Sequence, residues 1–235
     1  MKAAVYSGTR EVYRDISASC KSLLMHSDVE RVYLLIEDDK FPEVLPECVK
    51  AVNVSKQKYF RKTSPNYGCR WSYMVLLRAA YPKIFEKEPV STILTLDCDA
   101  IVCRDISELF KIDLGTNYLA GVAEPGKEVN GEPYINMGVA LMNLPLMLEE
   151  GIYEASVKAL NTKKYPFCEQ DVFNELCAGR KMLLDPQYNI SNWTRNSGKT
   201  SIRHFAAETG WRSKEMVRQY DRVPWLSIRE GKKRG

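Results

Sequence analysis

Short apolar runs alternate with an amphipathic segment near the start of this sequence, and this alternation restricts the fold more than any other feature. Ala3–Ser7 and Arg31–Ile36 are apolar runs of strand length, and Asp15–Met25 between them has apolar residues at helical spacing. Val49–Val54 reads as a weaker third strand. The order strand, helix, strand predicts an α/β protein with a mostly parallel central sheet and helices on both faces. In such sheets, ligands bind at the carboxyl ends of the strands.

The remaining segments continue this pattern, and we expect a single domain over residues 1–235, with a C-terminal helical extension and basic tail from about residue 211. Further strands are expected at Ile93–Val102, Leu119–Val122, Tyr134–Leu144, Met182–Leu184 and Ser201–Phe205. Helices are expected at Arg70–Phe85 (with a break at Pro82), Asp105–Phe110, Leu146–Leu160 and Phe167–Leu176, and a terminal helix or turn at Val217–Ile228. Loops are expected at Lys56–Cys69, Glu124–Pro133 and Asp185–Thr194.

Composition excludes several classes of protein. A net charge of +4 permits an anionic substrate but gives no nucleic-acid-binding signature, since the only basic run is the C-terminal GKKRG, which we expect to be a solvated tail. The seven cysteines include no C-x-x-C pair, which argues against a disulfide framework and a zinc ribbon. The sequence has no apolar run long enough to span a bilayer and no signal peptide, so we expect a cytoplasmic protein.

Two aspartates follow the apolar run at the centre of the sequence, which reads ILTLDCDAIV over Ile93–Val102. If strand geometry continues through this motif, the carboxylates of Asp97 and Asp99 point to the same face. Two like charges at one spot raise each other's pKa unless a cation neutralises them. Carboxylate oxygens in a partly open site suit Mg²⁺ or Mn²⁺, which share their coordination with substrate phosphates. The alternative is a solvated turn, because Asp is a common turn residue.

Other candidates are ambiguous when each is considered alone. Arg78 lies in an apolar helix, where it needs an anionic partner unless it reaches water at the helix end. Gly138 interrupts a strand, which indicates a bulge or a close approach to a ligand. Glu169 opens a helix, where acidic residues usually complement the dipole. A histidine beside a phenylalanine, as His204 is, is more often a packing residue than a metal ligand.

Five blocks, in order, resemble the sequence motifs of glycosyltransferase family 8, which includes glycogenin and the lipopolysaccharide galactosyltransferases. The resemblance runs over roughly Ala3 to Trp211, and the five blocks read LLRAAYPKIF, ILTLDCDAIV, YINMGVALMNL, FCEQDVFN and RHFAAETGW. The resemblance implies a GT-A fold and a metal site of Asp97, Asp99 and His204 that holds Mn²⁺ or Mg²⁺. It implies contacts to the donor from Tyr6, Ser7, Gly8, Arg78, Asp97, Cys98, Asn136 and Gly138. It further implies Gln170, Glu169 and Arg78 as catalytic residues near the sugar and its phosphates.

The function implied by this resemblance is metal-dependent, retaining transfer of a hexose from UDP-glucose or UDP-galactose to a glycan, lipid or protein acceptor. Two features depart from the family pattern. Glu169 stands where the family has Asp, and ETGW (Glu208–Trp211) lacks the family's diphosphate-binding Lys, for which Lys214, Lys56 or Arg61 are candidate substitutes. The missing Lys keeps open a non-catalytic sugar-nucleotide- or glycan-binding protein. A sugar nucleotidyltransferase is less favoured, because YSGTREVYR has one Gly and no Lys after the first strand.

Overall fold

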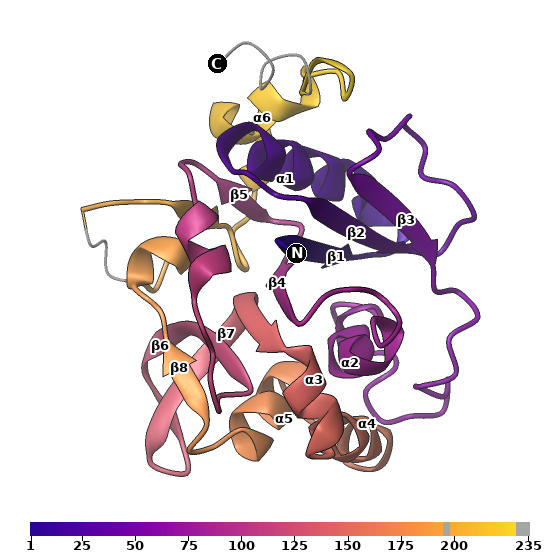
Figure 1. Cartoon of the computed structure of the whole chain (residues 1–235), viewed down its shortest axis with the longest axis vertical. Helices are drawn as coiled ribbons and strands as arrows, with labels where there is room; N and C mark the ends of the chain where they lie inside the picture. The colour runs from indigo at the N-terminus through magenta and orange to yellow at the C-terminus, as the bar shows by residue number, and fades with distance from the viewer. Residues whose placement is uncertain (195–197, 229–235) are drawn as a thin grey trace.

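A seven-stranded sheet forms the centre of the molecule in the computed structural model, which describes residues 1–194 and 198–228 (Figure 1). The strand order is β3-β2-β1-β4-β7-β6-β8, and within this sheet β7 alone runs against the others. The predicted mostly parallel α/β architecture is therefore confirmed. The strands are β1 (Ala3–Ser7), β2 (Arg31–Ile36), β3 (Val49–Asn53), β4 (Thr92–Leu96), β6 (Leu119–Val129), β7 (Glu132–Asn143) and β8 (Lys181–Leu183).

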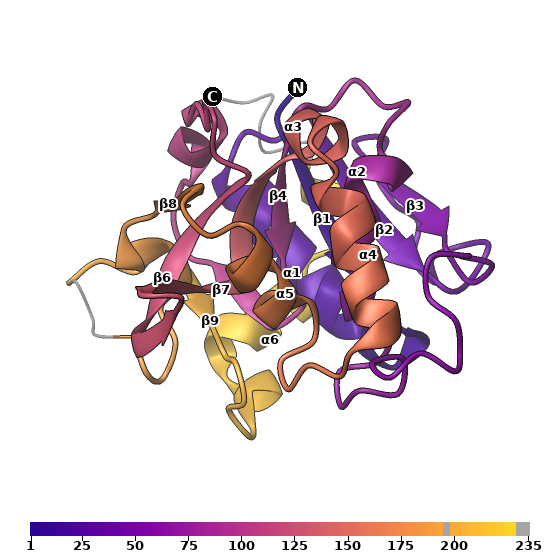
Figure 2. The ribbon, with the colours of Figure 1, turned by 90° about the horizontal axis from the view of Figure 1, so that it is seen from below.

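Helices cover both faces of the sheet, as Figures 1 and 2 show. On one face lies α1 (Tyr13–His26), against which α6 (Glu215–Asp221) packs. On the other face lie α2 (Tyr81–Ile84), α3 (Leu144–Glu149), α4 (Ile152–Thr162) and α5 (Glu169–Leu176). Alternate residues of β1 enter the two apolar cores, since Ala3 and Val5 pack on one face and Ala4 and Tyr6 on the other. Among the described residues, no helix is both long enough and apolar enough to cross a bilayer.

A second, two-stranded sheet pairs β5 (Ala100–Val102) antiparallel with β9 (Ile202–His204). The expected strand Ile93–Val102 is therefore two strands in different sheets, with the Asp-Cys-Asp motif in the turn between them. In that turn the Ala100 N–H donates to the Asp97 carbonyl at 3.1 Å. The predicted alternation of strand side chains does not apply there, so Asp97 and Asp99 converge because of the turn and not because of the strand.

Three other expected elements differ from the structure. The expected helix Arg70–Phe85 is a 3₁₀-helix at Val75–Ala80 followed by α2, and Pro82 lies in the first turn of α2 rather than at a break. The expected loop Glu124–Pro133 belongs mostly to the β6–β7 hairpin, whose Asn130-Gly131 turn has positive φ at both residues. The expected helix Leu146–Leu160 is interrupted at Gly151, which has φ 74°.

In the C-terminal part, the short 3₁₀-helix Trp211–Ser213 precedes α6, and Ser227 and Ile228 are also helical. A further 3₁₀-helix spans Ser107–Lys111, where a helix from Asp105 to Phe110 was expected. The Asp105 carboxylate accepts the N–H of Ser107 at 2.8 Å. The predicted basic tail GKKRG lies outside the described residues.

Candidate active site

A cavity of about 750 Å³ opens at the carboxyl ends of β1 and β4, the edge of the sheet where ligands were expected. Its volume falls in the range of small-molecule sites, which is about 300–1,000 Å³. Most of the residues expected at the donor and metal sites line it: Ser7, Gly8, Arg78, Asp97, Cys98, Asp99, Asn136, Glu169, Gln170 and His204. The cavity thus gathers residues from the β1 end, the aspartate turn, the β6–β7 hairpin, the start of α5 and the end of β9.

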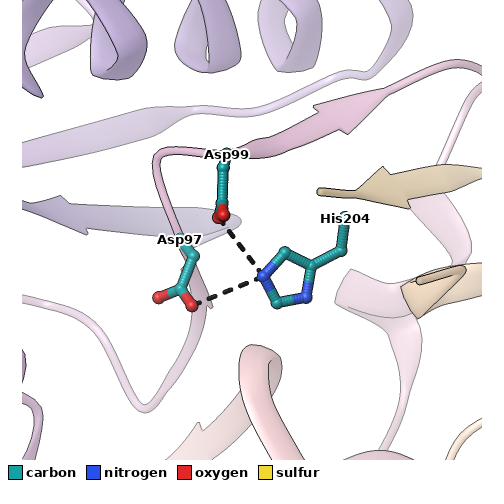
Figure 3. Close-up of side chains that lie close together, drawn as sticks. All are labelled: Asp97, Asp99 and His204. Atoms are coloured by element: carbon teal, nitrogen blue, oxygen red, sulfur yellow. Dashed lines mark ion pairs between the residues drawn. The ribbon is translucent and has the colours of Figure 1, made fainter. Parts of the chain in front are cut away.

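Asp97, Asp99 and His204 lie together on one wall of the cavity (Figure 3). The pairing of Ala100 with His204 in the small sheet places the imidazole opposite the residue that follows Asp99. His204 Nε2 lies 3.2 Å from a carboxylate oxygen of Asp99 and 3.6 Å from one of Asp97. One ligand atom from each residue lies within 4.8 Å of the others. Two carboxylates and an imidazole form a donor set that fits a divalent cation such as Mn²⁺.

Hydrogen bonds fix which nitrogen of His204 faces the carboxylates. Asn136 Oδ1 accepts the backbone N–H of Gly138 at 2.9 Å, which identifies that atom as oxygen, and it also accepts from Asn189 Nδ2 at 2.9 Å. The remaining amide atom of Asn189 is therefore its oxygen, and this oxygen lies 2.9 Å from His204 Nδ1. Nδ1 must donate, so the Nε2 lone pair of the neutral ring points at the two aspartates, as a metal ligand requires.

Without a cation, the same groups form an ion pair. Burial disfavours the charged form of His204, but the neighbouring Asp99 carboxylate outweighs burial and raises the pKa of the imidazole. Burial likewise acts to raise the pKa of Asp99, but the imidazole outweighs it and the net pKa is lowered. A divalent cation would take the place of the imidazole proton in holding the two carboxylates together.

Gly138 serves this site by leaving room for the imidazole. A Cβ atom built on Gly138 would lie 2.1 Å from His204 Cε1, far closer than atoms approach. Gly138 is not among the residues that line the cavity, so its sequence signal reflects a close approach by a protein side chain rather than by a ligand.

Arg78 is buried and joins two acidic residues of the site. Its guanidinium donates to Thr95 at 3.0 Å, to Asp97 at 2.6 Å and to Glu169. Burial opposes its charge, but these two carboxylates outweigh burial and raise its pKa further. The structure thus supplies the anionic partner that a buried Arg needs.

Glu169 is also buried, and it is not a solvent-exposed partner of the helix dipole. Its side chain is 4% exposed, and burial raises its pKa to about 8 even though Arg78 acts in the opposite direction. The pKa of this buried carboxyl group therefore lies close to neutral pH, where ordinary carboxyl groups are fully ionised.

The side-chain amides of Gln170 and Asn136 are held by the protein. Gln170 accepts the Met137 N–H at 2.9 Å and donates to Glu124 and to the Tyr134 hydroxyl at 3.1 and 3.2 Å. Asn136 donates to the same Glu124 carboxylate at 2.8 Å. These contacts join the start of α5 to the β6–β7 hairpin. Glu124 was not expected at the site, because its segment was predicted to be a loop.

Of the residues expected from the first strand, Ser7 and Gly8 line the cavity and Tyr6 does not. Tyr6 is fully buried on the α1 face, where its hydroxyl accepts from Ser19 at 3.1 Å. Because neighbouring strand residues face opposite ways, Ser7 points to the other side and donates to the Met74 carbonyl at 3.2 Å. The expected contact between the Tyr6 side chain and a donor is therefore not supported by its position.

The basic residues that line the cavity differ from those expected to replace the missing Lys. Lys214 pairs with Glu208, and neither it nor Lys56 or Arg61 lines the cavity. Besides the fully engaged Arg78, the Lys and Arg side chains that line the cavity within residues 1–194 and 198–228 are Arg70 and Lys127. The Lys127 ammonium lies 3.4 Å from a Glu124 carboxylate oxygen. Neither residue belongs to the five sequence blocks, so the motifs gave no signal for them.

Three streptococcal proteins are similar to this chain over part of their length. The probable glycosyl transferase Gly of Streptococcus gordonii is 34% identical over 127 residues, which are 53% of this chain and 18% of that protein. Glycosyltransferases GlyA and GlyE of Streptococcus pneumoniae are each 28% identical over 80% of this chain, and the match covers 28% and 48% of their lengths. The chain therefore spans less than half the length of these relatives.

Solved structures share the fold. The crystal structure of GlyE from S. pneumoniae superposes with a TM-score of 0.72 and 22% identity, covering 98% of this chain and 62% of that one. An active-site mutant of LgtC superposes with a TM-score of 0.70 and 16% identity, covering 97% and 95%. The fold is therefore the GT-A fold. The sequence model of glycosyl transferase family 8 matches residues 5–210, which is most of the chain, and the chain belongs to that family.

Proposed function

We propose that this chain transfers a hexose, with retention of configuration, from a UDP-sugar to an acceptor, and that it depends on Mn²⁺ or Mg²⁺. The observation that carries the proposal is the convergence of Asp97, Asp99 and His204 inside the cavity. Membership of family 8 supports a sugar-nucleotide donor and a glycan acceptor. We further propose that the donor is of the UDP-galactose or UDP-glucose type. One protein of similar fold, LgtC, is a galactosyltransferase whose structure was solved in complex with donor and acceptor sugar analogs.

The proposed roles follow from where the side chains lie. Asp97, Asp99 and His204 would hold the cation, which when bound supplies Lewis acidity toward the departing diphosphate. Arg78 keeps one oxygen of Asp97 in place and leaves the other directed toward His204. Ser7 and Gly8 line the β1 end of the cavity, where we place the nucleoside.

Two cations in the cavity wall are candidates for the role of the missing family Lys. Arg70 and Lys127 could stabilise the negative charge that develops on the departing diphosphate, because fixed cations in a partly closed cavity act strongly on such charge. Neither residue belongs to the ETGW segment, so binding of a diphosphate by Arg70 and Lys127 would not require the family's Lys.

Retention requires the acceptor to attack from the side on which the diphosphate leaves, unless the enzyme first forms a covalent intermediate. We propose front-face attack assisted by the departing phosphate. Gln170 is a poor nucleophile, and its amide is already held by three hydrogen bonds. The carboxyl group of Glu169 is engaged by Arg78.

A donor screen tests the proposal. Purified protein is incubated with a panel of UDP- and GDP-sugars with and without Mn²⁺, and both the shift in melting temperature and the release of free nucleotide are measured. We expect a stabilising shift and nucleotide release with one UDP-sugar, both lost in EDTA. Absence of both for every donor contradicts the proposal. A metal-dependent shift in melting temperature without turnover favours the alternative, a non-catalytic sugar-nucleotide-binding protein. The missing Lys is the sequence feature that supports this alternative.

A further inference from the structure

Two cysteines from distant parts of the sequence meet beside the cavity, and the proposed transfer reaction uses neither. Cys69 lies in the segment before the 3₁₀-helix at Val75–Ala80, and Cys168 directly precedes α5. Both are free thiols, and Cys69 is half-buried whereas Cys168 is 1% exposed. Cys168 belongs to the apolar core on the α4 face, and Cys69 packs against that core. The Cys168 thiol hydrogen-bonds to the Cys69 sulfur, so the two sulfurs are in contact.

A buried amide holds the two segments side by side. Asn66 is fully buried, and its Nδ2 donates to two carbonyl groups at the end of α4, each at 2.7 Å. Its Oδ1 accepts the Tyr165 N–H at 2.9 Å. A turn of the same length leads from each of these residues to a cysteine, since the Cys69 N–H donates to the Asn66 carbonyl at 3.1 Å and the Cys168 N–H to the Tyr165 carbonyl at 3.3 Å. The contact between the thiols is therefore built into the fold.

The backbone is strained at the same place. Positive φ angles occur in four non-glycine residues of the described chain, and two of them, Cys168 at 50° and Ser72 at 69°, lie at this contact. The Ser72 N–H donates to the Cys69 carbonyl at 3.1 Å. Such strain costs free energy and persists only where the surrounding structure holds the backbone, which is most common at functional sites.

The surroundings of Cys69 favour its thiolate form. The hydrogen bond from the Cys168 thiol, together with the Trp71 N–H and the Lys164 ammonium, outweighs burial and lowers the pKa of Cys69 to about 6. The same hydrogen bond and burial raise the pKa of Cys168. At neutral pH the contact thus joins a thiolate to a protonated thiol. A reactive thiolate next to a second thiol is the arrangement found in redox-active cysteine pairs.

We propose that Cys69 and Cys168 are a dithiol site that a peroxide oxidises reversibly to a disulfide, and that this modification lowers the activity of the adjacent site; the effect on activity rests on the proposed glycosyl transfer. The Cys69 sulfur attacks a peroxide oxygen, the O–O bond breaks, and the departing oxygen takes a proton and leaves as water. The Cys168 sulfur then attacks the resulting Cys69 sulfenic acid and loses its proton, and the S–O bond breaks to release a second water. Two electrons pass from the two thiols to one hydrogen peroxide, and an external dithiol reverses the reaction.

The new bond would connect two walls of the cavity. The three residues after Cys69 line it, as does Glu169, which follows Cys168. An S–S bond of about 2.05 Å is shorter than a hydrogen-bonded contact between two sulfurs, so the two segments must move closer together. Glu169 holds Arg78, and Arg78 in turn holds Asp97 of the metal site. A displacement at Cys168 therefore reaches groups whose positions the proposed transfer depends on.

The first part of the experiment uses the full native chain and detects the bond itself. Reduced protein is treated with hydrogen peroxide without denaturant, the remaining thiols are alkylated, and the digest is analysed by mass spectrometry. Cleavage after Lys and Arg places the cysteines of interest in Thr63–Arg70 and Tyr165–Arg180. The second peptide also contains Cys177, so further cleavage after glutamate is needed to separate it from Cys168.

We expect a peptide pair joined through Cys69 and Cys168 that disappears after treatment with dithiothreitol. Cys168→Ser should instead leave Cys69 as a sulfenic acid that dimedone traps. Cys103→Ser, which removes another half-buried thiol, should form the joined pair as the parent does. A parent protein in which Cys69 sulfenic acid accumulates without the joined pair overturns the inference, and so does a Cys69 that oxidises no faster than Cys103. Both results are read on the parent protein, so they do not depend on the folding of a variant.

The second part measures activity after the peroxide has been removed. Release of nucleotide from the UDP-sugar is compared in the oxidised, reduced and re-reduced protein with Mn²⁺. We expect a loss of at least about tenfold on oxidation, because small displacements of positioning groups are costly, and recovery with dithiothreitol. Peroxide-treated Cys69→Ser should keep its activity. Unchanged turnover in the disulfide form overturns the regulatory effect. Absence of turnover in the reduced parent contradicts the proposed function instead, and the joined peptides then still decide whether the cysteine pair is a redox site.

Discussion

Asn189 Oδ1 lies 2.9 Å from His204 Nδ1, and this contact directs the other imidazole nitrogen at Asp97 and Asp99. Asn189 is itself buried and held by Asn136, so the orientation of the ring is set by a chain of buried amides. Groups that orient a ligating histidine affect metal binding almost as much as the ligands do.

Asn189→Ala should therefore weaken Mn²⁺ binding about 10- to 100-fold. Without the acceptor at Nδ1, the ring is free to turn and to place its proton on Nε2. Isothermal titration of the metal into the protein measures the effect. Asn161→Ala is the matched control, because it removes a hydrogen-bonded amide that does not line the cavity and should leave Mn²⁺ binding unchanged. Equal affinities in the alanine variant and the parent would contradict this role.

Gly138→Ala should displace the imidazole, since the added Cβ would lie 2.1 Å from His204 Cε1. Forcing extra volume into a packed site costs about 1–3 kcal/mol, and here the metal response should fall as well. Gly68→Ala is the control, because a Cβ there meets no atom within 4 Å. Chemical unfolding and the Mn²⁺-induced melting shift report the two effects, and a Gly138→Ala protein that behaves like Gly68→Ala would refute this reading of the glycine.

At pH 9, where Glu169 with its pKa of about 8 is mostly ionised, Arg78→Met should destabilise the protein by about 3–5 kcal/mol, because it removes the partner of the buried carboxylate. Adding Glu169→Gln should restore part of that loss, since the neutral amide needs no counter-ion. Urea unfolding of the parent, the two single variants and the double variant gives the coupling energy. Additive effects of the two substitutions would show that the buried pair does not stabilise the fold.

Cys69 should react with iodoacetamide at neutral pH, unlike most thiols of the chain. A hydrogen bond from the Cys168 thiol lowers the pKa of Cys69 to about 6, whereas burial raises the pKa of Cys103, another half-buried thiol. Because the thiolate is the reactive form, the alkylation rate should rise as pH increases through 6 and level off above 7. Peptide mapping by mass spectrometry measures both sites, and Cys168→Ala should move the rise to higher pH. A Cys69 profile that matches that of Cys103 would contradict this account.

The sequence predicted the parts of the fold that depend on local pattern. The apolar runs of β1 and β2 and the helical spacing of apolar residues in α1 can each be recognised within a short stretch of sequence. The prediction of one long helix at Arg70–Phe85 was wrong. Apolar residues lie on all sides of such a helix, so their periodicity could not distinguish it from turns followed by a 3₁₀-helix. The β6–β7 hairpin had a usable signal in Asn130-Gly131, a dipeptide suited to a two-residue turn.

The site could be predicted only where a motif carried it. No local pattern links His204 to Asp97, since their meeting depends on the pairing of β5 with β9. The family resemblance supplied that link. Asn189 and Glu124 lie outside the motif blocks, and their roles come from tertiary contacts alone.

Isothermal titration of Mn²⁺ into the UDP-loaded protein tests the central claim most directly, with Asp99→Asn compared against the parent chain. The account predicts one Mn²⁺ per parent chain and at least about tenfold weaker binding by Asp99→Asn, which keeps the parent's circular dichroism spectrum. Equal Mn²⁺ affinity in the two proteins, or no Mn²⁺ binding by the parent, would contradict the assignment of Asp97, Asp99 and His204 as the metal site.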